Sequence, residues 1–397
     1  MRPGGLLIAA LMATAFFLTG DAPARTEPAA VRGSGDLGIV IERSSGSLLI
    51  VDTTQRQIIS RVEGMGDLSH ASAVFSPDSR YAFVFGRDGG LTKVDLLTSK
   101  IAGRVIQAGN SIGGAISDDG TLIAVANYEP GGVKVFDATT LAELAVIPAT
   151  WTGGQSKVIG LEDAPGRTFV FSLWDAGQTW IADLSNPANP VITKFTDIGK
   201  QPYDALITGN GRFYVAGLFG EDGLTMIDLW QDTPKPARIL DGYGRGRAPL
   251  PVYKMPHLES WAVAGDRLVL PAIGRNELLW ADLRGFAEIT RTPVYGQPVF
   301  AVARPDGRHV WVNFAPPNND TIQVVDSQTG KIVKELKPGP AVLHMEFTPR
   351  GHEVWVSVRD RNVVQVYDTR TFDLKAELPA VNPSGIFFSS RAHQVGL

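Results

Sequence analysis

Two of the six histidines, His70 and His257, stand at equivalent places in a repeated pattern and could hold a metal ion between them. Each lies six residues before a recurring turn position, Ser76 for His70 and Val263 for His257, and no other repeat unit has a histidine there. A neutral imidazole is a common iron ligand, and two opposed imidazoles can flank a flat iron macrocycle. His344, on the predicted inner strand of the last unit, could face the same channel. A pair of structural histidines remains open as the alternative.

Charged side chains are sorted by sign around the same face. The loops predicted after the second strand of each unit carry arginines in four units and carboxylates in the other four. The basic residues are Arg43, Arg87, Arg275, Arg359 and Arg361, and the acidic ones are Glu129, Asp175, Glu221, Asp222 and Asp320. A planar guanidinium suits two-point bonding to a carboxylate, so we expect the arginines to hold acidic groups of a ligand. Lys157, at the place that His70 has in its own unit, could join them. A solvated loop rim is the alternative.

One long loop is predicted on this face. Residues 241–256 are rich in glycine and proline, contain Arg245 and Arg247, and run directly into His257. Long loops of this kind serve as lids over sites or are inert insertions, and both interpretations stay open.

A sequence repeat predicts the strands that position these residues. A hydrophobic residue followed by aspartate ends a predicted strand at Asp52, Asp95, Asp137, Asp183, Asp228, Asp282, Asp326 and Asp368. The intervals are 43, 42, 46, 45, 54, 44 and 42 residues, which is the period of four-stranded β-propeller blades. Eight aspartates therefore predict eight blades.

Turns before each aspartate predict how the strands connect. Seven units have a turn rich in Gly, Pro, Asp and Asn, such as Pro305-Asp-Gly-Arg308, between β-rich runs. The first unit has only three strands, over 37–42, 47–52 and 57–62, and the missing strand is predicted near the C-terminus at 385–390. We therefore predict an all-β fold, a single eight-bladed β-propeller over residues 36–397, with blade 1 closed by N- and C-terminal strands.

Composition narrows the function classes. A net charge of −4 argues against a nucleic-acid surface, and the lack of cysteine excludes disulfides, thiolate metal sites, covalent c-type heme and cysteine lipidation. Residues 1–24 resemble a cleaved secretory signal peptide, with Arg2 followed by an apolar run too short for a membrane span, and residues 25–35 read as a flexible leader. These features predict a soluble periplasmic protein exported by general secretion.

The segment from Leu68 to Leu96, with His70 followed by a strand and a Gly86-Arg87-Asp88 turn, resembles the d1-heme propeller domain of cytochrome cd1 nitrite reductase. The segment 126–130 and the loop ending at His257 are also similar to that domain. The reductase, however, has a Cys-x-x-Cys-His cytochrome c domain and two distal histidines. This chain has no cysteine and only His257 of the pair, so nitrite reduction is not expected. The remaining resemblance is to the NirF family of heme d1 biogenesis proteins.

That resemblance implies a noncovalently bound ligand, heme d1 or a late precursor such as dihydro-heme d1, with His70 as the proximal iron ligand. It implies a role in heme d1 biosynthesis beside other biogenesis proteins and nitrite reductase, and leaves open whether the protein only holds the ring or also dehydrogenates a side chain. A non-enzymatic protein-interaction propeller is the alternative. A quinoprotein dehydrogenase is disfavoured because no recurrent Trp motif is present.

Overall fold

The computed structural model describes Met1 and residues 33–244, 261–272 and 274–394. Gly33–Leu397 form one compact unit. Within the described ranges the regular structure is β-strand, apart from the short 3₁₀ turns η1 (Ser34–Asp36), η2 (Arg359–Arg361) and η3 (Ser389–His393). Of the predicted signal peptide only Met1, and of the predicted leader only residues 33–35, lie within the described residues.

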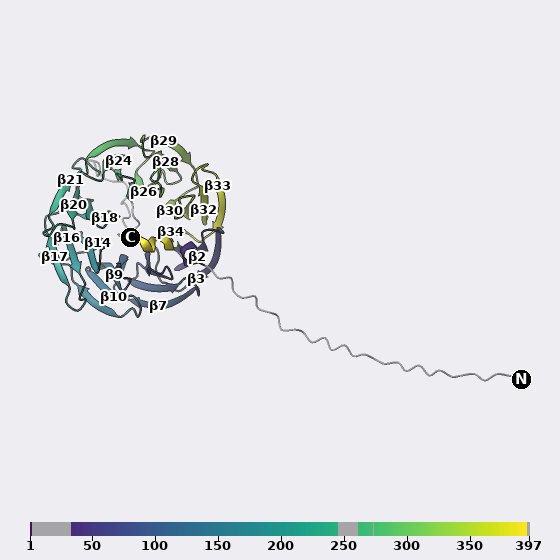
Figure 1. The fold of residues 1–397 in the computed structure, drawn as a ribbon, viewed down its shortest axis with the longest axis horizontal. Coiled ribbons are helices and arrows are strands. Elements are labelled where there is room, and N and C mark those ends of the chain that lie inside the picture. Colours follow the sequence, from purple (N-terminus) through teal and green to yellow (C-terminus); the bar gives the residue numbers. More distant parts are fainter. Residues whose placement is uncertain (2–32, 245–260, 273, 395–397) are drawn as a thin grey trace. The chain divides into compact units, whose positions relative to one another are not determined.

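Eight four-stranded antiparallel sheets surround a central axis, as Figure 1 shows. From the axis outward, blade 1 has β34 (Pro383–Phe388), β1 (Leu37–Glu42), β2 (Ser47–Asp52) and β3 (Gln57–Val62). Blade 2 has β4 (Ser72–Phe75), β5 (Tyr81–Phe85), β6 (Gly90–Asp95) and β7 (Lys100–Ile106). Blade 3 has β8 (Asn110–Ile116), β9 (Leu122–Glu129), β10 (Val133–Asp137) and β11 (Glu143–Ile147). Blade 4 has β14 (Val158–Ala164), β15 (Thr168–Leu173), β16 (Gln178–Asp183) and β17 (Val191–Phe195).

The second half of the ring repeats this plan. Blade 5 has β18 (Pro202–Ile207), β19 (Phe213–Leu218), β20 (Leu224–Asp228) and β21 (Pro236–Ile239). Blade 6 has β22 (Ala262–Ala264), β23 (Arg267–Ala272), β24 (Glu277–Asp282) and β25 (Glu288–Pro293). Blade 7 has β26 (Pro298–Ala303), β27 (His309–Phe314), β28 (Ile322–Asp326) and β29 (Ile332–Leu336). Blade 8 has β30 (Val342–Phe347), β31 (Glu353–Val358), β32 (Val363–Asp368) and β33 (Leu374–Pro379). A ribbon of β12 (Thr150–Trp151) and β13 (Gly154–Gln155) joins blades 3 and 4.

Both chain ends close blade 1, as predicted. The C-terminal strand β34 pairs with β1, with Gly38 opposite Phe388 and Val40 opposite Ile386. In Figure 1 this yellow strand lies beside the purple N-terminal strands. The closure leaves no open sheet edge between the first and last blades, so the ring is continuous.

The repeated aspartates have a local structural cause. Each ends the third strand of its blade and accepts hydrogen bonds from backbone N–H groups just ahead, which forms the turn into the outer strand. In blade 2, Asp95 Oδ1 accepts from Leu97 N at 3.0 Å and Thr98 N at 3.2 Å. In blade 7, Asp326 Oδ1 accepts in the same way from Gln328 N and Thr329 N. The aspartate repeat thus marks a turn that each blade needs.

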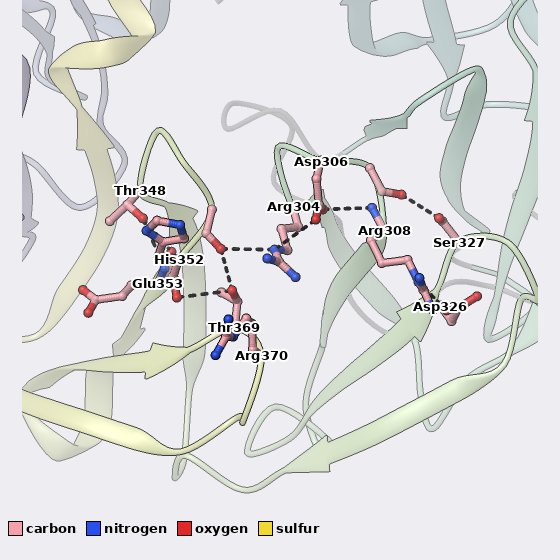
Figure 2. A network of polar contacts seen from close by, with 12 residues as sticks. Arg304, Asp306, Arg308, Asp326, Ser327, Thr348, His352, Glu353, Thr369 and Arg370 are labelled. Atoms are coloured by element: carbon pink, nitrogen blue, oxygen red, sulfur yellow. Dashed lines mark hydrogen bonds and ion pairs between the residues drawn. The ribbon is translucent and has the colours of Figure 1, made fainter.

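Two faces of the propeller differ in their loops. The connection face carries the connections between blades and the loops between second and third strands, and the turn face carries the turns between first and second strands. Figure 2 shows the turn face of blades 7 and 8, where Arg304 Nε donates to Gly351 O of the next blade at 3.1 Å. Such hydrogen bonds link the turns of adjacent blades on the turn face, which is the face opposite the candidate site.

Large side chains on the second strands form the interblade core. Trp311 on β27 packs with Val342 and Val354 of blade 8, and Trp355 on β31 packs with Phe388 of blade 1. Both indoles are fully buried. Burial of a side chain of this size stabilises the fold by on the order of 3 kcal/mol, so these contacts hold adjacent blades at a fixed angle.

Candidate functional site

A cavity of about 260 Å³ opens on the connection face, and blades 7, 8, 1 and 2 supply its wall. Its apolar lining includes Phe300, Phe314 and Leu343. Its polar lining includes His70, with Arg43 from the loop between β1 and β2 and Arg359 at the end of β31. The cavity therefore combines an apolar wall with one imidazole and two guanidinium groups.

Bulges in the innermost strands shape the wall. The register shifts between Pro298 and Ala301 on β26 and between Val342 and Met345 on β30. The residues within these two shifts include Phe300 and Leu343, both of which line the cavity. Since a bulge bends its strand and re-aims side chains, the shifts turn these apolar groups toward the channel mouth.

Buried polar side chains satisfy the backbone groups that the bulges free. Asn313, 1% exposed, accepts a hydrogen bond from Phe300 N at 2.9 Å and donates through Nδ2 to Val342 O at 3.0 Å. At the equivalent place on β31, Ser357 Oγ accepts from His344 N at 2.8 Å. An unpaired backbone group in this interior would cost roughly 1–3 kcal/mol, so these two side chains stabilise the bulged strands.

The connection from β3 to β4 carries His70 and is held from both sides. On the blade 1 side, Met65 N donates to Gly46 O at 3.0 Å. On the blade 2 side, Arg87 N donates to Asp67 O at 2.8 Å, and the Asp67 carboxylate accepts from Ser69 N at 2.8 Å. These hydrogen bonds hold the residues that precede His70 against the two loops that carry Arg43 and Arg87.

Asp88 organises the turn beside this connection. Its Oδ2 accepts from Arg104 Nη2 at 2.6 Å, its Oδ1 accepts from Gly90 N at 3.0 Å, and Arg104 Nη2 also donates to Met65 O at 3.1 Å. Gly66 passes so close that a Cβ there would lie 2.0 Å from Asp88 Oδ2, and its φ is +75°. The contact therefore requires glycine at this position.

The end of β1 positions Arg43. The neighbouring Glu42 is fully buried and accepts hydrogen bonds from Arg61 Nη2 at 2.8 Å and from Val381 N at 2.7 Å. Burial alone would raise the pKa of Glu42, but these bonds and one from Ser47 lower it overall. The ionised carboxylate thus anchors the strand end, and the next residue, Arg43, lines the cavity.

The electrostatics of the cavity favour a neutral His70 and a negatively charged ligand. Burial, with added repulsion from Arg87 and Arg43, lowers the pKa of His70 to about 4, although Asp67 opposes the shift. Burial also lowers the pKa of Arg43, and the nearby charges of Arg359 and Arg87 add to that effect. At neutral pH the imidazole is uncharged, which is the form that binds iron. The guanidinium groups of Arg43, Arg87 and Arg359 lie nearby, and Arg359 is paired with Asp360.

Several predicted site residues lie elsewhere or outside the described ranges. His257, Arg245 and Arg247 lie outside the described residues, so the opposed histidine pair stays a prediction. Lys157 is not on the cavity wall; its Nζ lies 3.3 Å from Asp175 Oδ1, and its backbone N–H donates to the same carboxylate. This pairing directs it to its own blade's loop.

His344, predicted to face the channel, lies buried between the inner strands of blades 8 and 1. Its side chain is 1% exposed, and Nδ1 accepts a hydrogen bond from Ile386 N at 3.0 Å. Its ring packs against Phe300 and Phe387, and burial lowers its pKa to about 3. It is not among the residues that line the cavity, because it joins the inner strands of blades 8 and 1.

Three arginines of the predicted arc pair with carboxylates. Arg359 lines the cavity, and its Nε also lies 2.6 Å from Oδ1 of the adjacent Asp360. Arg361 Nη2 lies 3.2 Å from Glu377 on the outer strand of blade 8, and Arg275 Nη2 lies 3.8 Å from Asp222.

Phe300, Leu343 and Asn313 line the cavity but were not predicted from the sequence. Only Asn313 left a signal, as a polar residue that interrupts the apolar run of β27.

Comparison with known proteins identifies the family. The model of the cytochrome D1 heme domain matches residues 32–392. Protein NirF of Stutzerimonas stutzeri is 59% identical over 92% of this chain and 95% of its own length, and that of Pseudomonas aeruginosa is 58% identical over 92% and 94%. The chain belongs to the NirF family. The solved structure of the dihydro-heme d1 dehydrogenase NirN in complex with DHE is also similar, with a TM-score of 0.79 and 27% identity over 93% of this chain and 78% of that one.

The described part of this NirF-family chain contains no helix long and apolar enough to cross a membrane.

Proposed function

We propose that this NirF-family protein binds heme d1 or a late precursor such as dihydro-heme d1 at the channel mouth, as a periplasmic accessory protein of heme d1 biosynthesis. The observation that carries the proposal is the neutral imidazole of His70 on an apolar cavity wall, flanked by Arg43, Arg87 and Arg359. Membership of the cytochrome D1 heme domain family supports a role in heme d1 biogenesis and nitrite reductase maturation.

The cavity's residue types fit an iron tetrapyrrole. His70 would supply the proximal nitrogen ligand to iron, and its low pKa keeps it unprotonated at neutral pH. Phe300, Phe314 and Leu343 would contact the apolar body of the ring. The prediction that His257 lies over the other face of the tetrapyrrole remains part of the proposal.

The arginines would hold the ring's carboxylates. Charge-assisted hydrogen bonds contribute roughly 1.5–3 kcal/mol each, more than neutral ones. Arg43 and Arg87 lie close enough to His70 to lower its pKa, and Arg359 lies close enough to Arg43 to lower that of Arg43. A bound carboxylate would relieve this repulsion, and at Arg359 it would add to or replace the pairing with Asp360.

Holding and orienting the ring is the role that these residues support best. The NirN complex concerns a dehydrogenase, and a similar oxidation here would require an electron acceptor. The sequence has no dinucleotide, flavin or covalent heme motif to supply one. An acceptor would therefore have to come from a partner, which extends the proposal beyond the chain's own residues.

An absorption titration with heme d1 tests the proposal. We expect the wild-type protein to shift the ligand's visible bands, and His70→Ala to abolish the protein-ligated spectrum. His352→Ala is a matched control because His352 lies on the turn face, in an exposed turn. A spectrum that does not change on mixing, or that is equal for wild type and His70→Ala, would contradict heme binding through His70.

A further inference from the structure

One position that recurs in the blades holds arginines on one side of the channel and aromatic residues on the other. The first residue of each second strand pairs with the repeated aspartate, as Tyr81 does with Asp95 and Glu353 with Asp368, which gives all blades a common register. We call the residue six places after it the rim position. In blades 1 to 5, 7 and 8 the rim positions hold Arg43, Arg87, Tyr128, Trp174, Phe219, Ala315 and Arg359, while that of blade 6 lies outside the described residues.

Rim positions of three blades lie at the channel mouth. Arg43, Ala315 and Arg359 all line the cavity described above, although they come from three different blades. By the same register, the rim positions of blades 3, 4 and 5 are all aromatic. We call Tyr128, Trp174 and Phe219 the aromatic arc. The rim thus has three guanidinium groups in blades 8, 1 and 2 and three aromatic rings in blades 3, 4 and 5.

Trp174 is the centre of a packed aromatic group. Its ring centroid lies 5.1 Å from that of Tyr203, edge-on, and 5.6 Å from that of Phe219, while Tyr203 and Phe219 are 5.2 Å apart. Tyr203 lies in the bulge of β18, at the register of the cavity-lining Val299 on β26. The contacts therefore hold Trp174 against an inner-strand residue at the mouth.

Open space adjoins the indole. A depression of about 660 Å³ on the connection face is bordered by Trp174 and by loop residues of blades 4 and 5, including Gly177 and Gly199. Trp174 is half-buried, so part of its ring stays accessible. Its partners restrict its rotation, which lowers the entropy that a ligand contact would cost.

The position of His70 determines which blades meet the edges of a flat ring. If His70 of blade 2 held the iron of a flat macrocycle, one face of the macrocycle would be turned toward blade 2 and the other toward blade 6, because these blades are opposite each other among the eight. Blades 8 and 4 lie a quarter turn away, so the edges of a ring standing in the mouth point toward them. A ring held in this way would have one edge near Arg359 of blade 8 and the other near Trp174 of blade 4.

We propose that Trp174, held by the buried Phe219 of the aromatic arc, contacts the edge of the tetrapyrrole remote from the arginines and fixes the ring's rotation in its own plane. This inference rests on the proposed function. A conjugated edge is favoured against aromatic side chains, whereas the edge with more carboxylate charge is favoured beside the guanidinium groups. The two arcs break the near-symmetry of the propeller, so one orientation of the ring is preferred.

Titrations with heme d1 test the arc through affinity and orientation. We expect Trp174→Ala to weaken binding about threefold to tenfold and to change the induced circular dichroism of the bound ring, with the His70-dependent absorption band kept. Trp174→Phe should restore most of both. Trp230→Ala is a matched control, because this exposed indole lies between the third and fourth strands of blade 5 on the turn face. Thermal melting of each variant would check folding.

The outcomes separate the arc from the proposed function. If Trp174→Ala binds as tightly as wild type, with unchanged circular dichroism, the role of the arc is overturned while binding through His70 stands. If wild type shows no His70-dependent band, the proposed function fails and the arc fails with it. A loss in Trp174→Ala that Trp174→Phe does not recover, with a lower melting temperature, would show that Trp174 is structural.

Discussion

Replacing Arg43 by methionine should weaken ligand binding without destabilising the ligand-free protein. Burial and two neighbouring arginines lower the pKa of Arg43, so its charged form is less favourable in the fold than in the unfolded chain. Methionine keeps an apolar stem of similar reach and removes this penalty. We therefore expect the free energy of unfolding of ligand-free Arg43→Met to stay equal or to rise by up to about 1 kcal/mol.

The effect on binding should have the opposite sign. A lost charge-assisted bond to a ligand carboxylate costs roughly 1.5–3 kcal/mol, which corresponds to roughly a tenfold to 150-fold higher Kd. The wild-type affinity should also fall with added salt, and the variant's affinity should fall less. Urea unfolding without ligand, and absorption titrations with heme d1 at two salt concentrations, would measure both effects.

A matched substitution on the turn face separates the two effects. Arg212 pairs with Asp228 at 2.7 Å, far from the cavity, so Arg212→Met should leave the affinity for heme d1 unchanged. The reasoning would be refuted if Arg43→Met bound heme d1 as tightly as wild type while unfolding at clearly lower urea. That result would make Arg43 a structural residue of blade 1.

Three further predictions concern the frame around the site. A chain that ends at Val381 lacks β34 and should aggregate or melt far below wild type by light scattering and circular dichroism; a soluble product with the wild-type melting curve would contradict closure of blade 1. Asp88→Asn should weaken heme d1 binding by on the order of 1 kcal/mol, because the connection that carries His70 would be held less firmly. Lys134→Met, which breaks an exposed ion pair, should leave the affinity unchanged. Equal affinities of wild type and Asp88→Asn would exclude a positioning role for Asp88. The pKa of His70 is about 4 in the folded protein and 6.5 in the unfolded chain, so the unfolded chain takes up the proton first as the pH falls. The free energy of unfolding should therefore drop by on the order of 2 kcal/mol between about pH 6.5 and 4. His70→Gln should show a shallower drop in urea unfolding, and parallel profiles would rule out this coupling.

The sequence by itself was sufficient to predict the ring and its closure. The aspartates and the turn residues act through hydrogen bonds to backbone groups only two or three residues away, so their spacing is visible without any tertiary contact. Once each blade has a common register, counting places His70, Arg43 and Arg87 on one face. This is why the strands of blade 1 and the arginines near His70 could be predicted.

Only the tertiary structure decided which side chains form the cavity. Phe300 and Leu343 line it because inner-strand bulges re-aim them, and the bulges depend on bonds such as that of Asn313 to Val342 in the next blade. Tertiary contacts also explain why two predicted site residues do not line the cavity. Lys157 pairs with Asp175, and His344 accepts a hydrogen bond from Ile386 N. These contacts join residues from 13 to 42 positions apart, across strands and blades. Local periodicity does not encode such pairings, because packing between neighbouring sheets selects them.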